Sequence, residues 1–136
     1  MRPALNWLIL FLSLVAMSIP TQADNGSRAD AEKVLNRYFA ALQSGDVEAL
    51  QSLLGGELLE KRLRLLKNPT YPPYLRTTYQ TTIFTIVESR FVAPNKVSIR
   101  AKYIFENQPP LYKNFLLIRE DKIEDARFRI YSESTL

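Results

Sequence analysis

The apolar residues of this chain change their spacing once, near its middle. Between residues 31 and 66 they recur every three or four positions, which predicts helices, because an α-helix turns about every 3.6 residues. We predict a first helix that ends at Gly45 and a short second one that begins after Asp46. A third helix follows Gly55-Gly56, covers residues 57–67 and ends at Asn68-Pro69. The buried face of the first helix is expected to consist of Ala31, Val34, Leu35, Tyr38, Phe39 and Leu42.

After a predicted loop over residues 69–73, apolar and polar positions alternate, as they do in a half-buried strand. We predict strands over residues 77–92, 97–106 and 112–120. In a last strand, Ala126, Phe128 and Ile130 are expected to point inward. Three helices followed by about four antiparallel strands make an α+β domain, in which the helices cover one face of a curved sheet.

The first 23 residues have the layout of a secretory signal: Arg2, an apolar run from Leu5 to Ile19, and small residues before Asp24. The apolar run is shorter than the roughly 18 to 20 residues of a membrane-spanning helix. We therefore expect a cleaved signal, a periplasmic or secreted protein, and no membrane span in the mature chain. A flexible lead at residues 24–28 would precede a single domain over residues 29–136. The alternative is an uncleaved N-terminal anchor.

Residue types that are absent from the chain exclude several kinds of chemistry. The chain has no Cys and no His, which excludes disulfides, thiol chemistry, a structural zinc site and a Ser-His-Asp triad. It also has no glycine-rich phosphate loop. The formal net charge of +4 is too small to indicate a nucleic-acid partner. We expect neither a metal nor a cofactor.

Two groups of basic residues in the domain are candidates for contact with a partner. The first, on the predicted third helix, is interpreted as a solvated helix face, because acidic residues one turn earlier can pair with two of its members. It consists of Lys61, Arg62, Arg64 and Lys67. The second group lies on the outer face of the sheet by strand parity and is either solvated or a docking site for an acidic envelope protein. It consists of Arg100, Lys102, Arg127 and Arg129.

The segment Val34 to Leu42, the turn Ser44-Gly45-Asp46 and the continuation Val47 to Leu50 resemble the start of the nuclear transport factor two-like superfamily. This superfamily includes ketosteroid isomerase-like and SnoaL-like proteins. The resemblance implies a cone-shaped fold whose sheet and helices enclose a pocket. It does not imply catalysis, because the superfamily contains enzymes, ligand carriers, assembly modules and secretion components. The general acids and bases of its enzymes are inward-pointing Asp or His side chains, and this chain has no His.

Few side chains of this chain are candidates for chemistry inside such a pocket. By strand parity, Glu88 and Glu124 are the carboxylates that could point inward and act as catalytic bases. Aromatic side chains could line the pocket or simply fill the core. The aromatic candidates are Tyr38, Tyr79, Tyr103, Phe105 and Phe128.

Three functions are compatible with these patterns. The leading hypothesis is an exported, non-enzymatic domain of the cell envelope that binds a small apolar ligand or another protein. The first alternative is an isomerase-type or cyclase-type enzyme in which an inward Glu acts as base and a Tyr as hydrogen-bond donor. The second is a structural component of an envelope assembly or secretion apparatus. The sequence leaves open whether the protein forms a homodimer.

Overall fold

The computed structural model describes residues 28–120 and 127–136. Within these ranges the chain forms four helices and a four-stranded antiparallel sheet, which confirms the predicted α+β class. The helices are one over residues 28–44, α2 (Val47–Leu53), α3 (Gly56–Lys67) and α4 (Tyr71–Tyr79). The strands lie in the sheet in chain order and are β1 (Ile83–Ala93), β2 (Lys96–Ile104), β3 (Leu111–Glu120) and β4 (Arg127–Thr135).

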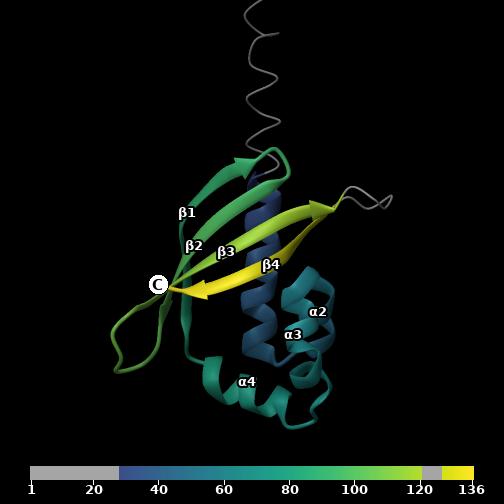
Figure 1. The fold of residues 1–136 in the computed structure, drawn as a ribbon. Coiled ribbons are helices and arrows are strands. Elements are labelled where there is room, and N and C mark those ends of the chain that lie inside the picture. Colours follow the sequence, from purple (N-terminus) through teal and green to yellow (C-terminus); the bar gives the residue numbers. More distant parts are fainter. Residues whose placement is uncertain (1–27, 121–126) are drawn as a thin grey trace, which may run out of the picture.

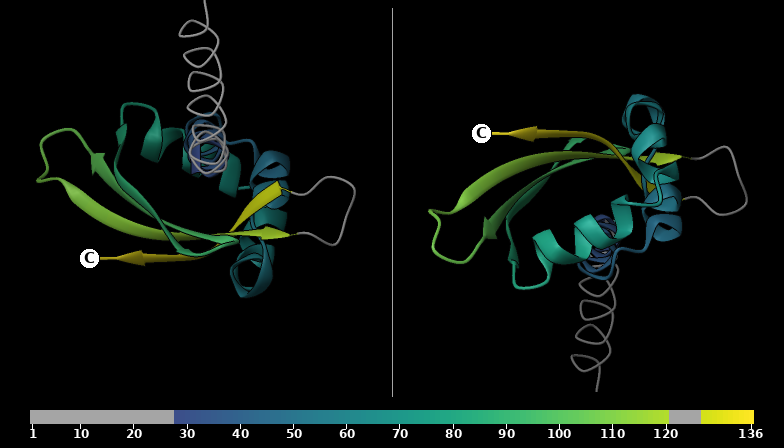
Figure 2. Two further views of the ribbon diagram at one scale, coloured as in Figure 1. Left: turned by 90° about the horizontal axis from the view of Figure 1, so that it is seen from above. Right: turned by 90° about the horizontal axis from the view of Figure 1, so that it is seen from below.

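The 28–44 helix crosses the sheet on one side, and the other helices gather around its C-terminal end (Figure 1). The views from above and below show this helix and α4 on the same side of the curved sheet (Figure 2). The short helices α2 and α3 contact β4 at the sheet edge.

The region between α3 and β1 differs from the prediction of three helices and a loop. Residues 71–79 form the helix α4, and the first strand begins at Ile83 rather than at residue 77. Pro72 and Pro73 lie in the first turn of α4, where a proline costs no helical hydrogen bond because those N–H groups have no partner in the helix. The prolines therefore begin this helix, and the buried side chain of Leu75 attaches it to the core.

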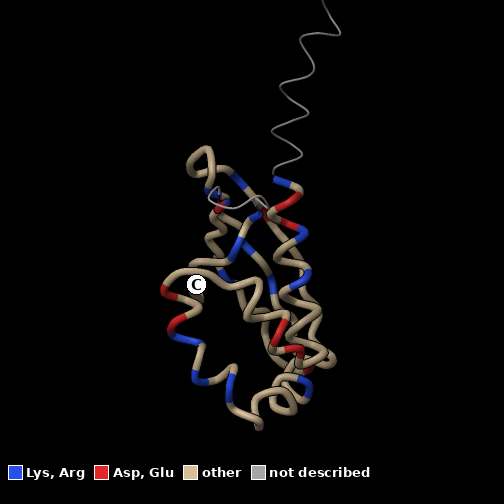
Figure 3. The backbone as a smooth tube through the Cα atoms, turned by 90° about the vertical axis from the view of Figure 1, so that its right-hand side faces the viewer, with Lys and Arg blue, Asp and Glu red and all other residues tan. Residues whose placement is uncertain are grey.

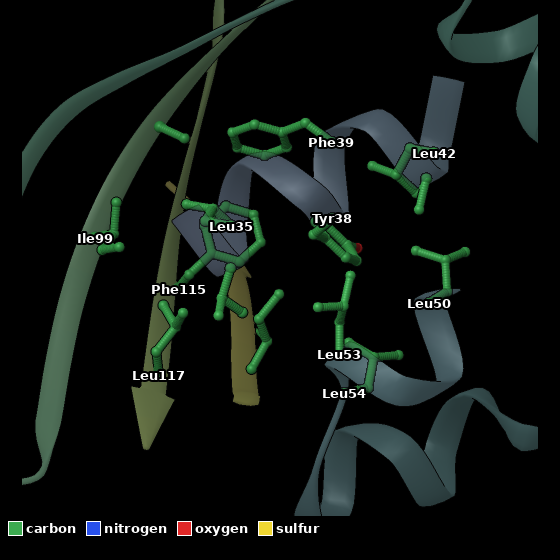
Figure 4. Close-up of a cluster of buried hydrophobic side chains, with 14 of the residues drawn as sticks. Leu35, Tyr38, Phe39, Leu42, Leu50, Leu53, Leu54, Ile99, Phe115 and Leu117 are labelled. Carbon is green, nitrogen blue, oxygen red and sulfur yellow. The ribbon is translucent and has the colours of Figure 1, made fainter. Parts of the chain in front are cut away.

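The core lies between the 28–44 helix and the inner face of the sheet (Figure 4). Leu35 and Phe39 are buried on the helix, as its apolar spacing predicts. They face strand residues that include Ile99 and Phe115, which are also buried. The Phe39 ring lies 6.1 Å from the Phe115 ring, centroid to centroid, in an edge-to-face arrangement that aromatic pairs favour.

The register of the sheet shifts at three bulges, and two of them decide which side of the sheet a glutamate faces. In β1, Ile86 is paired with Ala101 but Glu88 with Arg100, so one extra residue lies between them. In β4, Ile130 is paired with Leu117 but Ser132 with Leu116, and Tyr131 is the extra residue. Because side chains alternate along a strand, each extra residue moves all following side chains to the opposite face.

The bulge in β4 is held against the loop between α2 and α3. The N–H of Gly55 donates to the carbonyl of Ile130 at 3.0 Å, and the Tyr131 ring packs on Gly55 and Gly56. A Cβ on Gly56 would lie 2.7 Å from the Tyr131 ring, and the φ angle of this glycine is +55°. Both facts require glycine at this position. The Tyr131 hydroxyl is hydrogen-bonded to Glu120.

Candidate functional site

A pocket of about 490 Å³ opens between the 28–44 helix, α3, α4 and the last two strands. The helix α4, which the sequence analysis missed, provides four of the lining residues. The exposed side chains of Leu65 and Tyr74 lie at the rim, and that of Tyr38 is buried. The lining consists of Tyr38, Leu42, Arg62, Leu65, Asn68, Thr70, Tyr71, Tyr74, Leu75, Tyr79, Lys113 and Glu133.

A carboxylate with three hydrogen-bond donors lies on one wall of this pocket. Arg62 Nη2 donates to Glu133 Oε2 at 2.5 Å, and Tyr38 donates to the same oxygen at 3.0 Å. Lys113 Nζ donates to Glu133 Oε1 at 2.7 Å. Arg62 Nη1 also donates to the Tyr38 hydroxyl oxygen at 3.2 Å. We call these four residues the Glu133 cluster.

The electrostatics of the cluster keep Glu133 ionised. Burial by itself would raise the pKa of Glu133, but the hydrogen bond from Lys113 and the charge of Arg62 outweigh it, so the pKa lies below its ordinary value. Burial, together with the Glu133 charge, raises the pKa of Tyr38 far above its ordinary value. At neutral pH the cluster thus holds one carboxylate, two cations and a protonated tyrosine. Such a carboxylate is a weak base, and the tyrosine is a weak acid.

A second part of the pocket lining is aromatic and comes from α4. The rings of Tyr71 and Tyr74 are stacked, with centroids 6.2 Å apart and 16° between their planes. Burial raises the pKa of Tyr79 to about 12, so this side chain is uncharged at neutral pH. The lining of the pocket therefore combines the charged Glu133 cluster with flat, mainly apolar surface from α4.

The structure brings together two of the five aromatic candidates from the sequence, Tyr38 and Tyr79. Tyr103 and Phe105 lie behind the lining, and both rings contact the Tyr79 ring. Lys113 Nζ lies 5.2 Å from the centroid of the Tyr103 ring, which is a cation–π contact. The buried Tyr103 hydroxyl has no hydrogen-bond partner within the part of the chain that the structure describes.

Phe128 lies away from this pocket. Its side chain is buried and lines a separate, smaller cavity of about 170 Å³, together with Val34 and Arg37 from the 28–44 helix. The five aromatic side chains therefore do not form one site.

The two carboxylates that the sequence suggested as bases do not reach the pocket in the described residues. Glu88 is exposed and is paired with Arg100, which lies on the outer face, because the β1 bulge shifts the strand by one residue. Glu124 falls outside the described residues. The described residues thus contain an inward carboxylate, Glu133, at a position that the sequence analysis did not consider.

The four cations predicted for the outer face do not form one cluster. Arg100 is paired with Asn114, whereas Arg127 is paired with Glu120, six residues further along β3. At about 3.3 Å per residue, this offset is about 20 Å. Arg129 forms an ion pair with Glu120 at 3.5 Å, and Lys102 is half-buried. Figure 3 likewise shows Lys and Arg at many levels of the backbone, interspersed with Asp and Glu. Docking of an acidic partner at this face stays a prediction.

Three residues of the Glu133 cluster were missed or misinterpreted in the sequence: Glu133, Lys113 and Arg62. If the alternation of β4 before its bulge continued, Glu133 would lie on the outer face of the sheet. The bulge turns its side chain inward, and the bulge is visible only in the structure. Arg62 was interpreted as part of a solvated helix face, but its side chain is only 23% exposed. One signal was present, because position 58, one turn before Arg62, is a leucine and offers it no acidic partner.

Comparisons with known proteins do not assign the chain to a family. No family model matches it, and no curated protein matches it either. Among residues 28–120 and 127–136, no helix is long and apolar enough to cross a membrane. In the same residues, no three acidic side chains come together in a way that could hold a metal ion. The function must therefore be argued from the pocket itself.

Proposed function

We propose that this protein is a non-enzymatic binding module that holds a small molecule in the pocket beside the Glu133 cluster. The observation that carries the proposal is the pocket, whose volume of about 490 Å³ lies within the usual range for small-molecule sites. Its lining also has the composition of such sites, with aromatic and aliphatic walls and a few polar groups at one place.

The enzyme alternative receives less support from the site. An isomerase-type base needs a pKa near the operating pH, which burial away from cations usually produces. The pKa of Glu133 is instead lowered by two cations that it holds in place. Glu88 is exposed and does not line the pocket. Binding is therefore the better account of these residues.

Two further parts of the proposal rest on the sequence. The layout of residues 1–23 supports export to the periplasm or the outside of the cell. The similarity of residues 34–50 to the nuclear transport factor two-like superfamily supports a member of that group. Helices on one side of a curved antiparallel sheet, with a pocket between them, are consistent with such a fold.

Binding can be tested with N-phenyl-naphthylamine, an uncharged two-part aromatic probe whose fluorescence rises in apolar surroundings. We expect saturable binding by the native protein. Leu65→Trp should reduce the affinity at least tenfold, because Leu65 lines the pocket and its replacement would fill the entrance. Ile83→Trp is the matched control, since Ile83 is also exposed but does not line the pocket. Equal binding by both variants, or no saturable binding by the native protein, would contradict the proposal.

A further inference from the structure

The charges that line the pocket do not cancel. Among the described residues that line it, Arg62 and Lys113 are cations and Glu133 is the one acidic residue. The lining of the pocket therefore carries a net charge of +1. A molecule that displaces water from this wall leaves the charge poorly solvated unless it supplies a negative group.

Glu133 fixes the two cations in position. Its side chain is only 7% exposed, and those of Arg62 and Lys113 are 23% and 17% exposed, so all three are held at the wall and the cations still reach the pocket. Tyr38 and Glu133 engage two N–H groups of Arg62, whose guanidinium carries five. The Lys113 ammonium has three N–H groups and uses one of them for Glu133. The two side chains thus form an oriented pair of donors for an oxyanion.

The other wall defines the body of the ligand. The stacked rings of Tyr71 and Tyr74, with Tyr79 and Leu75, offer flat aromatic and aliphatic surface. Such surface favours a planar apolar group, which can stack on the tyrosine rings. The cationic donors Arg62 and Lys113 and the aromatic surface of α4 thus line the same cavity.

We infer that the ligand of this pocket is a planar apolar molecule with a single oxyanion, such as an aromatic carboxylate, whose negative group accepts hydrogen bonds from Arg62 and Lys113 on the pocket side of Glu133. The inference rests on the proposed function and specifies its ligand class. Glu133 is a positioning residue in this arrangement, because it orients both cations without contacting the planar part of the ligand.

The test compares two probes that share the same aromatic frame. Anilinonaphthalene sulfonate carries one negative charge, whereas N-phenyl-naphthylamine carries none. We expect the native protein to bind the sulfonate at least tenfold more tightly, and this preference to shrink as salt concentration rises. If both probes bind with equal affinity, the anion inference is wrong while the proposed function stands. If neither probe binds, the proposed function itself fails.

Variants of the charged wall sharpen the test. Lys113→Met should weaken the sulfonate about tenfold and leave the uncharged probe within about twofold, because one cation is worth about that much at a partly buried site. Lys102→Met is the control, since it removes the same charge from a strand residue that does not line the pocket. If Lys113→Met weakens both probes equally, the cation acts on the structure of the pocket and the inference is overturned.

A second substitution does not touch the Glu133 cluster. Asn68→Asp adds a negative charge to the lining and keeps the side-chain oxygen that accepts from the Thr70 N–H and hydroxyl. It should weaken the sulfonate about threefold and leave the uncharged probe unaffected. The control is Asn114→Asp in β3, which lines a separate cavity beside Arg100. Near-ultraviolet circular dichroism of each variant verifies the fold. An unchanged sulfonate affinity of folded Asn68→Asp would count against the inference.

Discussion

Two glutamates on opposite faces of the sheet show how one extra residue decides the role of a side chain. Glu88 follows the bulge in β1 and is exposed, with Arg100 as its partner across the strands. Glu133 follows the bulge in β4 and is buried, with hydrogen bonds from Tyr38, Arg62 and Lys113. Without the bulges, each glutamate would lie on the other face. A candidate carboxylate in a strand is therefore defined by the bulges that precede it as much as by the residue type.

The contrast between the two carboxylates predicts a large difference in stability. Glu133→Gln leaves Arg62 and Lys113 close together without a counter-charge, which should lower the free energy of unfolding by about 2–3 kcal/mol, somewhat less than for a fully buried pair. Glu88→Gln should change it by less than about 0.5 kcal/mol, because the Glu88 side chain is exposed and a solvated surface charge contributes little. Urea unfolding followed by circular dichroism measures both values. Equal losses of unfolding free energy in the two variants would show that the burial of Glu133 adds nothing to its contribution to stability.

The bulge in β4 is itself open to a mutational test. Gly56→Ala forces a side chain into a positive-φ position and against the Tyr131 ring, and it should cost about 1–2 kcal/mol. The same substitution in a Tyr131→Ala background should cost less, because only the backbone strain remains. A double-mutant cycle from urea unfolding gives the coupling between the two residues. A coupling of zero would mean that the Tyr131 ring does not hold the bulge against the glycine.

The smallest expected effect is that the free energy of unfolding decreases at acid pH. The folded pKa of Glu133 lies below its ordinary value of 4.5, so its charge stabilises the fold above that pH. This contribution is lost as the pH falls from about 4.5 through the folded pKa, where the carboxylate becomes protonated in both states. The stability advantage of the native protein over Glu133→Gln should thus be constant near neutral pH and narrow in acid. Urea unfolding midpoints of both proteins across this pH range test the prediction. A stability advantage of the native protein that grows as the pH falls would contradict it.

Much of the architecture could be predicted from the sequence because it depends on how apolar residues are spaced over a few neighbouring positions. The apolar spacing that includes Leu35 and Phe39 identified the buried face of the 28–44 helix, and strict alternation identified β2 with Val97 and Ile99 inward. The break after Asn68 was also correct as the end of α3. Each of these signals lies within a few residues of the feature that it predicts.

The candidate site could be predicted only in part, because its residues come from distant segments. Tyr38 and Tyr79 were identified by their aromatic character, but α4 was hidden by two prolines and by Thr77 and Thr78, which are typical of strands. Arg62 and Glu133 are 71 residues apart, and nothing near either residue indicates that they meet.

The sequence by itself determined the α+β class, the buried helix face, the strand alternation and the absence of Cys and His chemistry. Only the tertiary structure decided which carboxylate points inward. The physical reason is that the alternation along β4 is reset at Tyr131, whose ring packs on Gly55 and Gly56 at the start of α3. A contact between segments so far apart leaves no local period, yet it sets the direction of Glu133 and thereby assembles the pocket.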